Sequence, residues 1–110
     1  MKVVATRGRG NIESISVTET DPITQTTTDF IFAENNTTRV EVKAGGASIS
    51  SDTTDVSFAS NKIMMKLGKL ELPEGKYDVK VIIFTATAPE GTEIVGPSRD
   101  ANITLLMNAP

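Results

Sequence analysis

The chain contains no cysteine and no histidine. The lack of cysteine excludes disulfide bonds, thiol nucleophiles and thiolate metal sites. The lack of histidine removes the usual general base near neutral pH, and together the two absences exclude Ser-His-Asp and Cys-His catalysis. We therefore expect a protein that is not an enzyme and that holds neither a metal nor a cofactor.

Tryptophan is also absent, and aromatic residues make up only 5% of the 110 residues. The core must then consist of Val, Ile, Leu, Met and four Phe side chains, which suits a thin sandwich better than a ligand-enclosing barrel. The length is typical of a single domain. We expect this domain at residues 12–107, after an N-terminal arm or short edge strand at 1–11 and before a tail at 108–110.

The charges are nearly balanced, with 11 basic and 14 acidic residues and a net charge of −3. This balance does not favour a nucleic acid or an anionic membrane as partner. No apolar run approaches the ~18 residues of a membrane span, and the first residues lack the apolar run of a secretory signal. We expect synthesis in the cytoplasm and no membrane partner.

The strongest pattern lies in residues 70–86, where two apolar-alternating runs meet at a Pro-Glu-Gly corner. After the corner, Tyr77, Val79 and Val81 alternate with charged residues, which is the period of a strand with one buried face. The run then becomes continuously apolar through Phe84. This pattern predicts a central strand.

Leu72, Gly75 and Tyr77 have the spacing Leu-x-x-Gly-x-Tyr of a tyrosine corner. In that motif a tyrosine at the start of a strand bonds back to the backbone upstream and fixes a Greek-key crossover. Tyr77 is the only tyrosine, so no other residue competes for this role. We expect these three residues to form a structural corner.

Several other segments alternate apolar and polar residues and are expected to be short strands. Ile15 and Val17 are expected to point inward from an edge strand, and a bend near Gly68 competes with a short helix over residues 63–70. The remaining expected strands are residues 1–5, a hairpin over 30–43, and segments near 49, 56–58, 92–95 and 101–107. About seven short strands with regularly spaced turns are typical of a β-sandwich.

The second half of the chain, roughly residues 70–107, resembles the fibronectin type III and immunoglobulin-like superfamily. The resemblance implies an all-β fold, an immunoglobulin-like (Greek-key) β-sandwich of about seven strands. The first half departs from the family because it has no early tryptophan and no cysteine pair, which leaves the strand order open. The residues that carry the resemblance are Leu72, Pro73, Gly75, Tyr77, Val79 and Val81, followed by Gly96, Pro97 and Ser98 before the last strand.

A small immunoglobulin-like domain without disulfides is similar in architecture to the accessory domains of tailed-phage particles. This similarity implies a non-enzymatic structural or interaction module that is a component or accessory domain of a phage or prophage virion. Its partners would be copies of itself, as a homo-oligomer, or other virion subunits. The alternative is a β-sandwich that binds carbohydrate or mediates cell-surface adhesion through loops at residues 34–38, 50–55 and 88–91.

The last two long strands carry more apolar residues than one buried face requires. Ile82, Phe84, Leu106 and Met107 therefore form a candidate interface for an oligomer or an assembly. In the competing interpretation, the N-terminal segment covers this face. The sequence leaves the two interpretations open.

Asp52 and Asp55 share a polar loop, and Asp100 lies in another, so these carboxylates are candidates for binding a hard cation. Their spacing is not that of an EF-hand, and solvated loop acids are the favoured interpretation.

The corner is also surrounded by acidic residues, which could act as a glycosidase acid pair. Lysines alternate with these acids, so charge pairing across an exposed face is the better interpretation. The acids are Glu71, Glu74 and Asp78, and the lysines are Lys69, Lys76 and Lys80.

Overall fold

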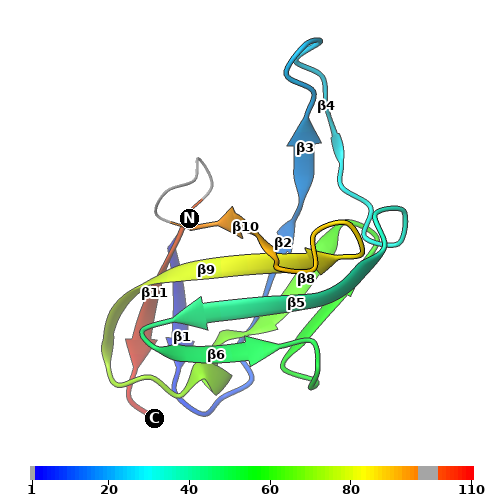
Figure 1. Cartoon of the computed structure of the whole chain (residues 1–110). Coiled ribbons are helices and arrows are strands. Elements are labelled where there is room, and N and C mark those ends of the chain that lie inside the picture. The colour runs from blue at the N-terminus through cyan, green and yellow to red at the C-terminus, as the bar shows by residue number, and fades with distance from the viewer. Residues whose placement is uncertain (1, 97–101) are drawn as a thin grey trace.

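The computed structural model describes residues 2–96 and 102–110 and shows an all-β chain with several sheets (Figure 1). The largest sheet has six strands. Five of them lie side by side in the order β1 (Lys2–Thr6), β11 (Ile103–Asn108), β9 (Gly75–Thr85), β5 (Thr37–Ala44) and β6 (Ala47–Ser50). The sixth, β10 (Thr92–Val95), also pairs with β9.

The remaining strands form two smaller sheets. A three-stranded sheet has the order β2 (Ile12–Ser16), β8 (Lys62–Lys66) and β7 (Val56–Ala59), and a two-stranded ribbon pairs β3 (Thr18–Thr20) with β4 (Thr27–Asp29). One 3-10 helix, η1 (Leu67–Leu70), follows β8. Among the described residues, no helix has the length and apolar character needed to cross a membrane.

The six-stranded and three-stranded sheets enclose one hydrophobic core. Val79 and Val81 of β9 are fully buried, as are Ile63 and Met65 of β8. Burial of apolar surface is the dominant favourable contribution to folding, so these inward-facing side chains hold the two layers together.

Strand β9 is the central strand that the sequence predicts. One edge pairs with β5 along Lys80–Thr85, and the other pairs with β11 along Gly75–Val79 and with β10 along Val81–Ile83. The edge strand β1 runs parallel to β11 and buries Val3 and Ala5, so the expected first strand is part of the sheet.

The expected hairpin over residues 30–43 is wrong. Strand β5 pairs with β6 and β9, and the segment before it is a turn. Phe32 is nevertheless only 1% exposed, because its ring packs edge-on against Phe30 and Phe58 with centroids 5.6 and 5.2 Å apart. Its backbone N–H donates to the carbonyl of Ser60 at 2.9 Å, so the alternation reflects burial rather than a strand ladder.

The described residues form eleven strands, more than the seven expected from the sequence. The ribbon β3–β4 accounts for part of the excess, since no strand pair was expected at residues 18–29. The segment at 63–70 combines both expectations, because β8 ends at Lys66 and η1 follows. Pro97, Ser98 and Ala101, which the expected connection and last strand include, lie outside the described residues.

Candidate contact surfaces

The structure brings together the three residues of the expected corner. The Tyr77 hydroxyl donates a hydrogen bond of 2.7 Å to the carbonyl of Pro73. Leu72 is buried, and Gly75 begins β9, where an added Cβ would lie 3.6 Å from the Tyr77 hydroxyl oxygen. The bond from the tyrosine to the backbone upstream is therefore present, as the spacing predicts.

The turn between β5 and β6 closes on the same tyrosine ring. Gly45 and Gly46 have φ angles of +54° and +83°, as in the type I′ turns that join hairpin strands through two residues. A Cβ added to Gly45 would lie 2.6 Å from Cδ1 of Tyr77 and 3.0 Å from Cδ2 of Leu72. Only glycine fits there, so the turn and the corner form one packed unit.

The variant Tyr77→Phe tests the corner, because it removes the hydroxyl and keeps the ring. We expect it to lower the free energy of unfolding by about 1 kcal/mol, the usual net contribution of one hydrogen bond. Urea denaturation measures the loss. The control Thr20→Val removes a hydroxyl from the exposed ribbon and should change stability by less than about 0.5 kcal/mol; equal losses in both variants would contradict a locking role for Tyr77.

The candidate interface residues do not form one patch. Ile82 and Phe84 lie partly buried on the outer face of β9, next to Gly91, where an added Cβ would lie 2.6 Å from Cγ2 of Ile82. Leu106 is partly buried and pairs with Lys76, six positions along β9 from Ile82. At about 3.3 Å per residue, this places Leu106 about 20 Å from Ile82 along the strand.

Met107 is not available for an interface, which corrects the expectation from the sequence. Its side chain is 0% exposed and points into the core with Leu105. Three apolar residues in succession must alternate between two faces, and the pairing of β11 with β1 and β9 turns only Leu106 outward. Strand β1 extends the sheet beside β11, so the idea that the N-terminal segment covers this face is also wrong.

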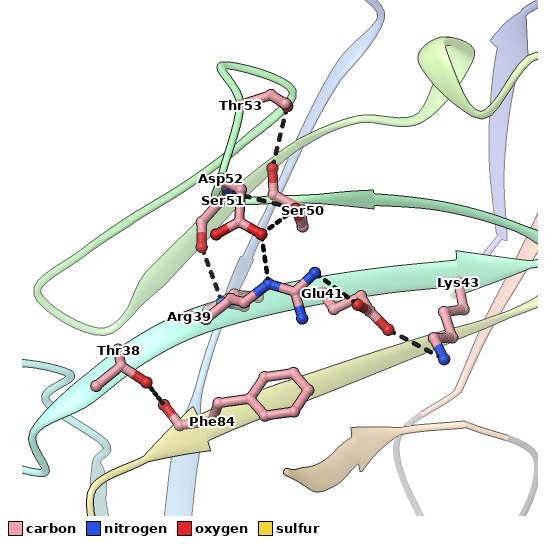
Figure 2. Close-up of polar contacts among 10 residues, drawn as sticks. Thr38, Arg39, Glu41, Lys43, Ser50, Ser51, Asp52, Thr53 and Phe84 are labelled. Atoms are coloured by element: carbon pink, nitrogen blue, oxygen red, sulfur yellow. Dashed lines mark hydrogen bonds and ion pairs between the residues drawn. The ribbon is translucent and has the colours of Figure 1, made fainter. Parts of the chain in front are cut away.

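A cluster of charged side chains covers the outer face of β5 (Figure 2). Arg39 contacts the carboxylate of Asp52 through Nε at 2.7 Å and that of Glu41 through Nη2 at 2.8 Å. Lys43 Nζ lies 3.1 Å from the other Glu41 oxygen. The cluster ties β5 to the loop after β6, and both carboxylates already have cationic partners.

The same cluster sits against the apolar residues of β9. The Glu41 side chain is only 12% exposed, and the Arg39 guanidinium lies 5.2 Å from the centre of the Phe84 ring. That distance is within the range of a cation–π interaction. The arrangement fixes the charges in place and shields Phe84, so it is suited to holding β5 and β9 together.

Removing the carboxylate of Glu41 tests this role. We expect Glu41→Gln to lower the free energy of unfolding by about 1 kcal/mol, because its partners are partly exposed, and the loss should shrink near 1 M salt. Urea denaturation at low and high salt measures both effects. Glu74→Gln, at an exposed position in the corner loop, is the control; a loss in that variant equal to the loss in Glu41→Gln would contradict the role of the cluster.

Asp52 and Asp55, two of the carboxylates considered for a cation, belong to no metal-binding cluster among the described residues. Asp52 is bound to Arg39, and the backbone N–H of Asp55 donates a hydrogen bond to the Thr53 hydroxyl oxygen at 3.2 Å. In the part of the chain that the structure describes, no group of three or more His, Cys, Asp or Glu side chains could hold a metal ion. Asp100 lies outside the described residues.

The expected charge pairing around the corner is not found within residues 2–96 and 102–110. The ion pairs that join two residues of these ranges belong to the cluster of Arg39, Glu41, Lys43 and Asp52. Glu71, Glu74 and Asp78 are exposed. These acids are therefore solvated.

The most distinctive surface is the projecting arm, which we define as residues 18–29. It consists of β3, a turn and β4, and Figure 1 shows it extending away from the body of the molecule. Every residue of its two strands is exposed, and Ile23 in the turn is 90% exposed. The arm thus presents an apolar side chain to solvent.

Local hydrogen bonds order the tip of the arm. The Asp21 carboxylate accepts from the backbone N–H groups of Ile23 at 2.8 Å and Thr24 at 3.3 Å. The hydroxyls of Thr20 and Thr27 lie 3.0 Å apart across the strands. This arm could not be predicted from the sequence, because a segment of threonine and acidic residues without an apolar face resembles a loop.

An open groove of about 620 Å³ lies where the arm meets the body, between β2–β3 and β10. Its apolar lining includes Ile15, Phe30 and Ile94. Two of the loops of the ligand-binding alternative are contacted by residues just outside another of these loops: Ala86 donates to the carbonyl of Asn36 at 3.1 Å, and Arg39 reaches Asp52.

No known protein family, no curated protein and no solved structure matches the chain. A function therefore has to be proposed from the surfaces described above. Among them, the projecting arm is the surface that extends away from the body of the molecule and exposes every residue of its two strands.

Proposed function

We propose that this chain is a non-enzymatic structural module that joins subunits within a larger assembly. The projecting arm is the observation that carries this proposal. A two-stranded ribbon without a hydrophobic face is marginally stable alone in water, and here it holds Ile23 90% exposed. Such an element adds nothing to the core of its own domain, so a role in contact with another subunit explains its presence.

We also propose that the fold is an immunoglobulin-like Greek-key sandwich. In that fold one layer contains strands C, F and G, the other contains B, E and D, and a tyrosine near the start of strand F bonds to the backbone upstream. The order β11-β9-β5 fits the first layer, β2-β8-β7 fits the second, and Tyr77 lies near the start of β9. The arm then occupies the connection between strands B and C.

The assembly we propose is a phage or prophage particle. This part of the proposal follows from the similarity of a small disulfide-free sandwich to the accessory domains of tailed phages. In this role the arm, rather than a binding pocket, makes the specific contacts.

The test replaces residues 19–28 by an Asn-Gly turn. Thr18 and Asp29 are paired across the base of the arm, so a two-residue hairpin turn can join them without disturbing the body. The wild-type and the arm-deleted chains are each expressed in a host that carries the encoding phage or prophage. Quantitative mass spectrometry then measures the amount of each chain in purified particles.

We expect the wild-type chain in the particles and the arm-deleted chain to be absent, although both fold with the same urea midpoint. Incorporation of the arm-deleted chain at the wild-type level would contradict a contact role for the arm. Absence of the wild-type chain from particles, together with glycan-array binding that survives arm removal, would favour the carbohydrate alternative.

A further inference from the structure

We infer that the arm binds a second copy of this chain, on the outer face of the β2-β8-β7 sheet. This inference rests on the proposed contact role of the arm and names its partner. The receiving surface is called the docking face below. It consists of the outward-facing side chains Ile12, Ser14, Ser16, Ser57, Ala59, Lys62, Met64 and Lys66.

The docking face carries two exposed apolar side chains, Ile12 at the start of the edge strand β2 and Met64 in the middle of β8. Ile12 is 62% exposed and Met64 is 39% exposed. Ile12 pairs with Lys66 and Met64 pairs with Ser14, so Ile12 and Met64 are diagonal neighbours on one face. The serine and alanine side chains around them are small, which leaves room for an approaching ribbon.

The charges of the two surfaces are complementary. Residues 10–38 contain five acidic residues and no Lys or Arg, and three of the acids, Glu19, Asp21 and Asp29, lie on the arm. The docking face carries Lys62 and Lys66, and no carboxylate is among its residues as described. Complementary potentials of this kind steer association and select the partner.

The exposed apolar side chains fall on the same two surfaces. In the described part of the chain, four large apolar side chains are exposed, and three of these are Ile12, Ile23 and Met64. Ile23 stands at the tip of the arm, and the other two lie next to each other on the docking face. Burial of Ile23 against Ile12 and Met64 would remove most of this exposed apolar surface from water.

The arm cannot reach the docking face of its own molecule. It continues the line of β2 and extends beyond the end of the sheet (Figure 1). Ile12 begins β2 and Thr20 ends β3, so about 26 Å of extended chain separates them at about 3.3 Å per residue. The contact must therefore be made between copies, and two different surfaces meeting in this way give head-to-tail rings or filaments.

The test uses three substitutions of an exposed apolar residue by glutamate. Ile23→Glu disables the arm, Met64→Glu disables the docking face, and Val4→Glu, at a position 52% exposed on the other sheet, is the matched control. Urea denaturation verifies that all three fold as the wild type does. Sedimentation velocity over rising protein concentration, at low and at high salt, then measures the mass of each chain and of mixtures.

We expect the wild type and Val4→Glu to grow beyond dimers with concentration, and less so at high salt. Ile23→Glu and Met64→Glu should each remain monomers. An equal mixture of these two variants should form dimers and nothing larger, because one intact arm can meet one intact docking face.

A wild type that stays monomeric at all concentrations would overturn the inference, as would association of Ile23→Glu at the wild-type level. A mixture of the two variants that forms no dimers would show that the arm does not bind this face. If the wild type stays monomeric but enters particles in an arm-dependent way, this inference fails while the proposed function stands.

Discussion

Replacement of Gly68 by alanine is expected to lower the free energy of unfolding by about 3 kcal/mol, at the upper end of overpacking costs. Gly68 is buried in η1, and an added Cβ would collide with the carbonyl oxygens of Thr6 and Arg9. These are backbone atoms, so no side chain can rotate away. Relief would require movement of the loop after β1, whose Gly8 N–H donates to the Gly68 carbonyl at 2.9 Å.

Urea denaturation of Gly68→Ala and Gly10→Ala measures this effect. The control is matched because a Cβ on Gly10 would have its nearest neighbour, the Lys66 Cδ atom, 4.0 Å away. We expect Gly10→Ala to stay within about 0.5 kcal/mol of the wild type. Equal stability of the two variants would show that the loop after β1 does not pack on η1 as described.

Replacement of Phe32 by alanine is expected to cost about 4 kcal/mol, as for other large-to-small changes of buried aromatic residues. The Phe32 side chain is 1% exposed and contacts the rings of Phe30 and Phe58 edge-on. Its removal leaves a cavity next to the base of the arm and breaks both aromatic contacts. The loss should appear as a lower urea midpoint.

Phe84→Ala is the matched control for this variant. Phe84 is partly buried on the outer face of β9, where Arg39 lies over its ring. We expect its loss to be less than half that of Phe32→Ala, since part of the surface it covers is already in contact with water. A larger loss of stability for Phe84→Ala than for Phe32→Ala would contradict the placement of the main core on the inner face of β9.

The strands with one buried face could be predicted from the sequence. In β9, Val79 and Val81 alternate with charged residues, so the period and the inward parity are both visible along the chain. The Tyr77 bond could be predicted as well, because both of its partners lie within five residues. Local spacing determines features of this kind.

Features that depend on pairing could not be predicted. Phe30 and Phe32 alternate as in a strand, but their N–H groups donate to Val17 and Ser60, which are distant in the sequence. Met107 follows two other apolar residues, so only the register of β11 decides that it points inward. A local pattern does not contain this information.

The candidate surfaces were missed for related reasons. Arg39 and Asp52 meet only because β5 and β6 form a hairpin that brings their loop back over β5. The arm contains strands without an apolar face, and such strands resemble loops in the sequence. The docking face becomes visible only when Ile12 and Met64 are placed on one side of a sheet.

Hydrogen exchange of the backbone amides is the measurement that tests most directly whether the arm is the contact element. It should compare the isolated chain at low concentration with the same chain in its assembled state. We expect amides of residues 18–29 to exchange rapidly in the isolated chain and to become protected on assembly, while those of β9 are protected in both states. Equally rapid exchange of the arm in both states would contradict the contact role of the arm.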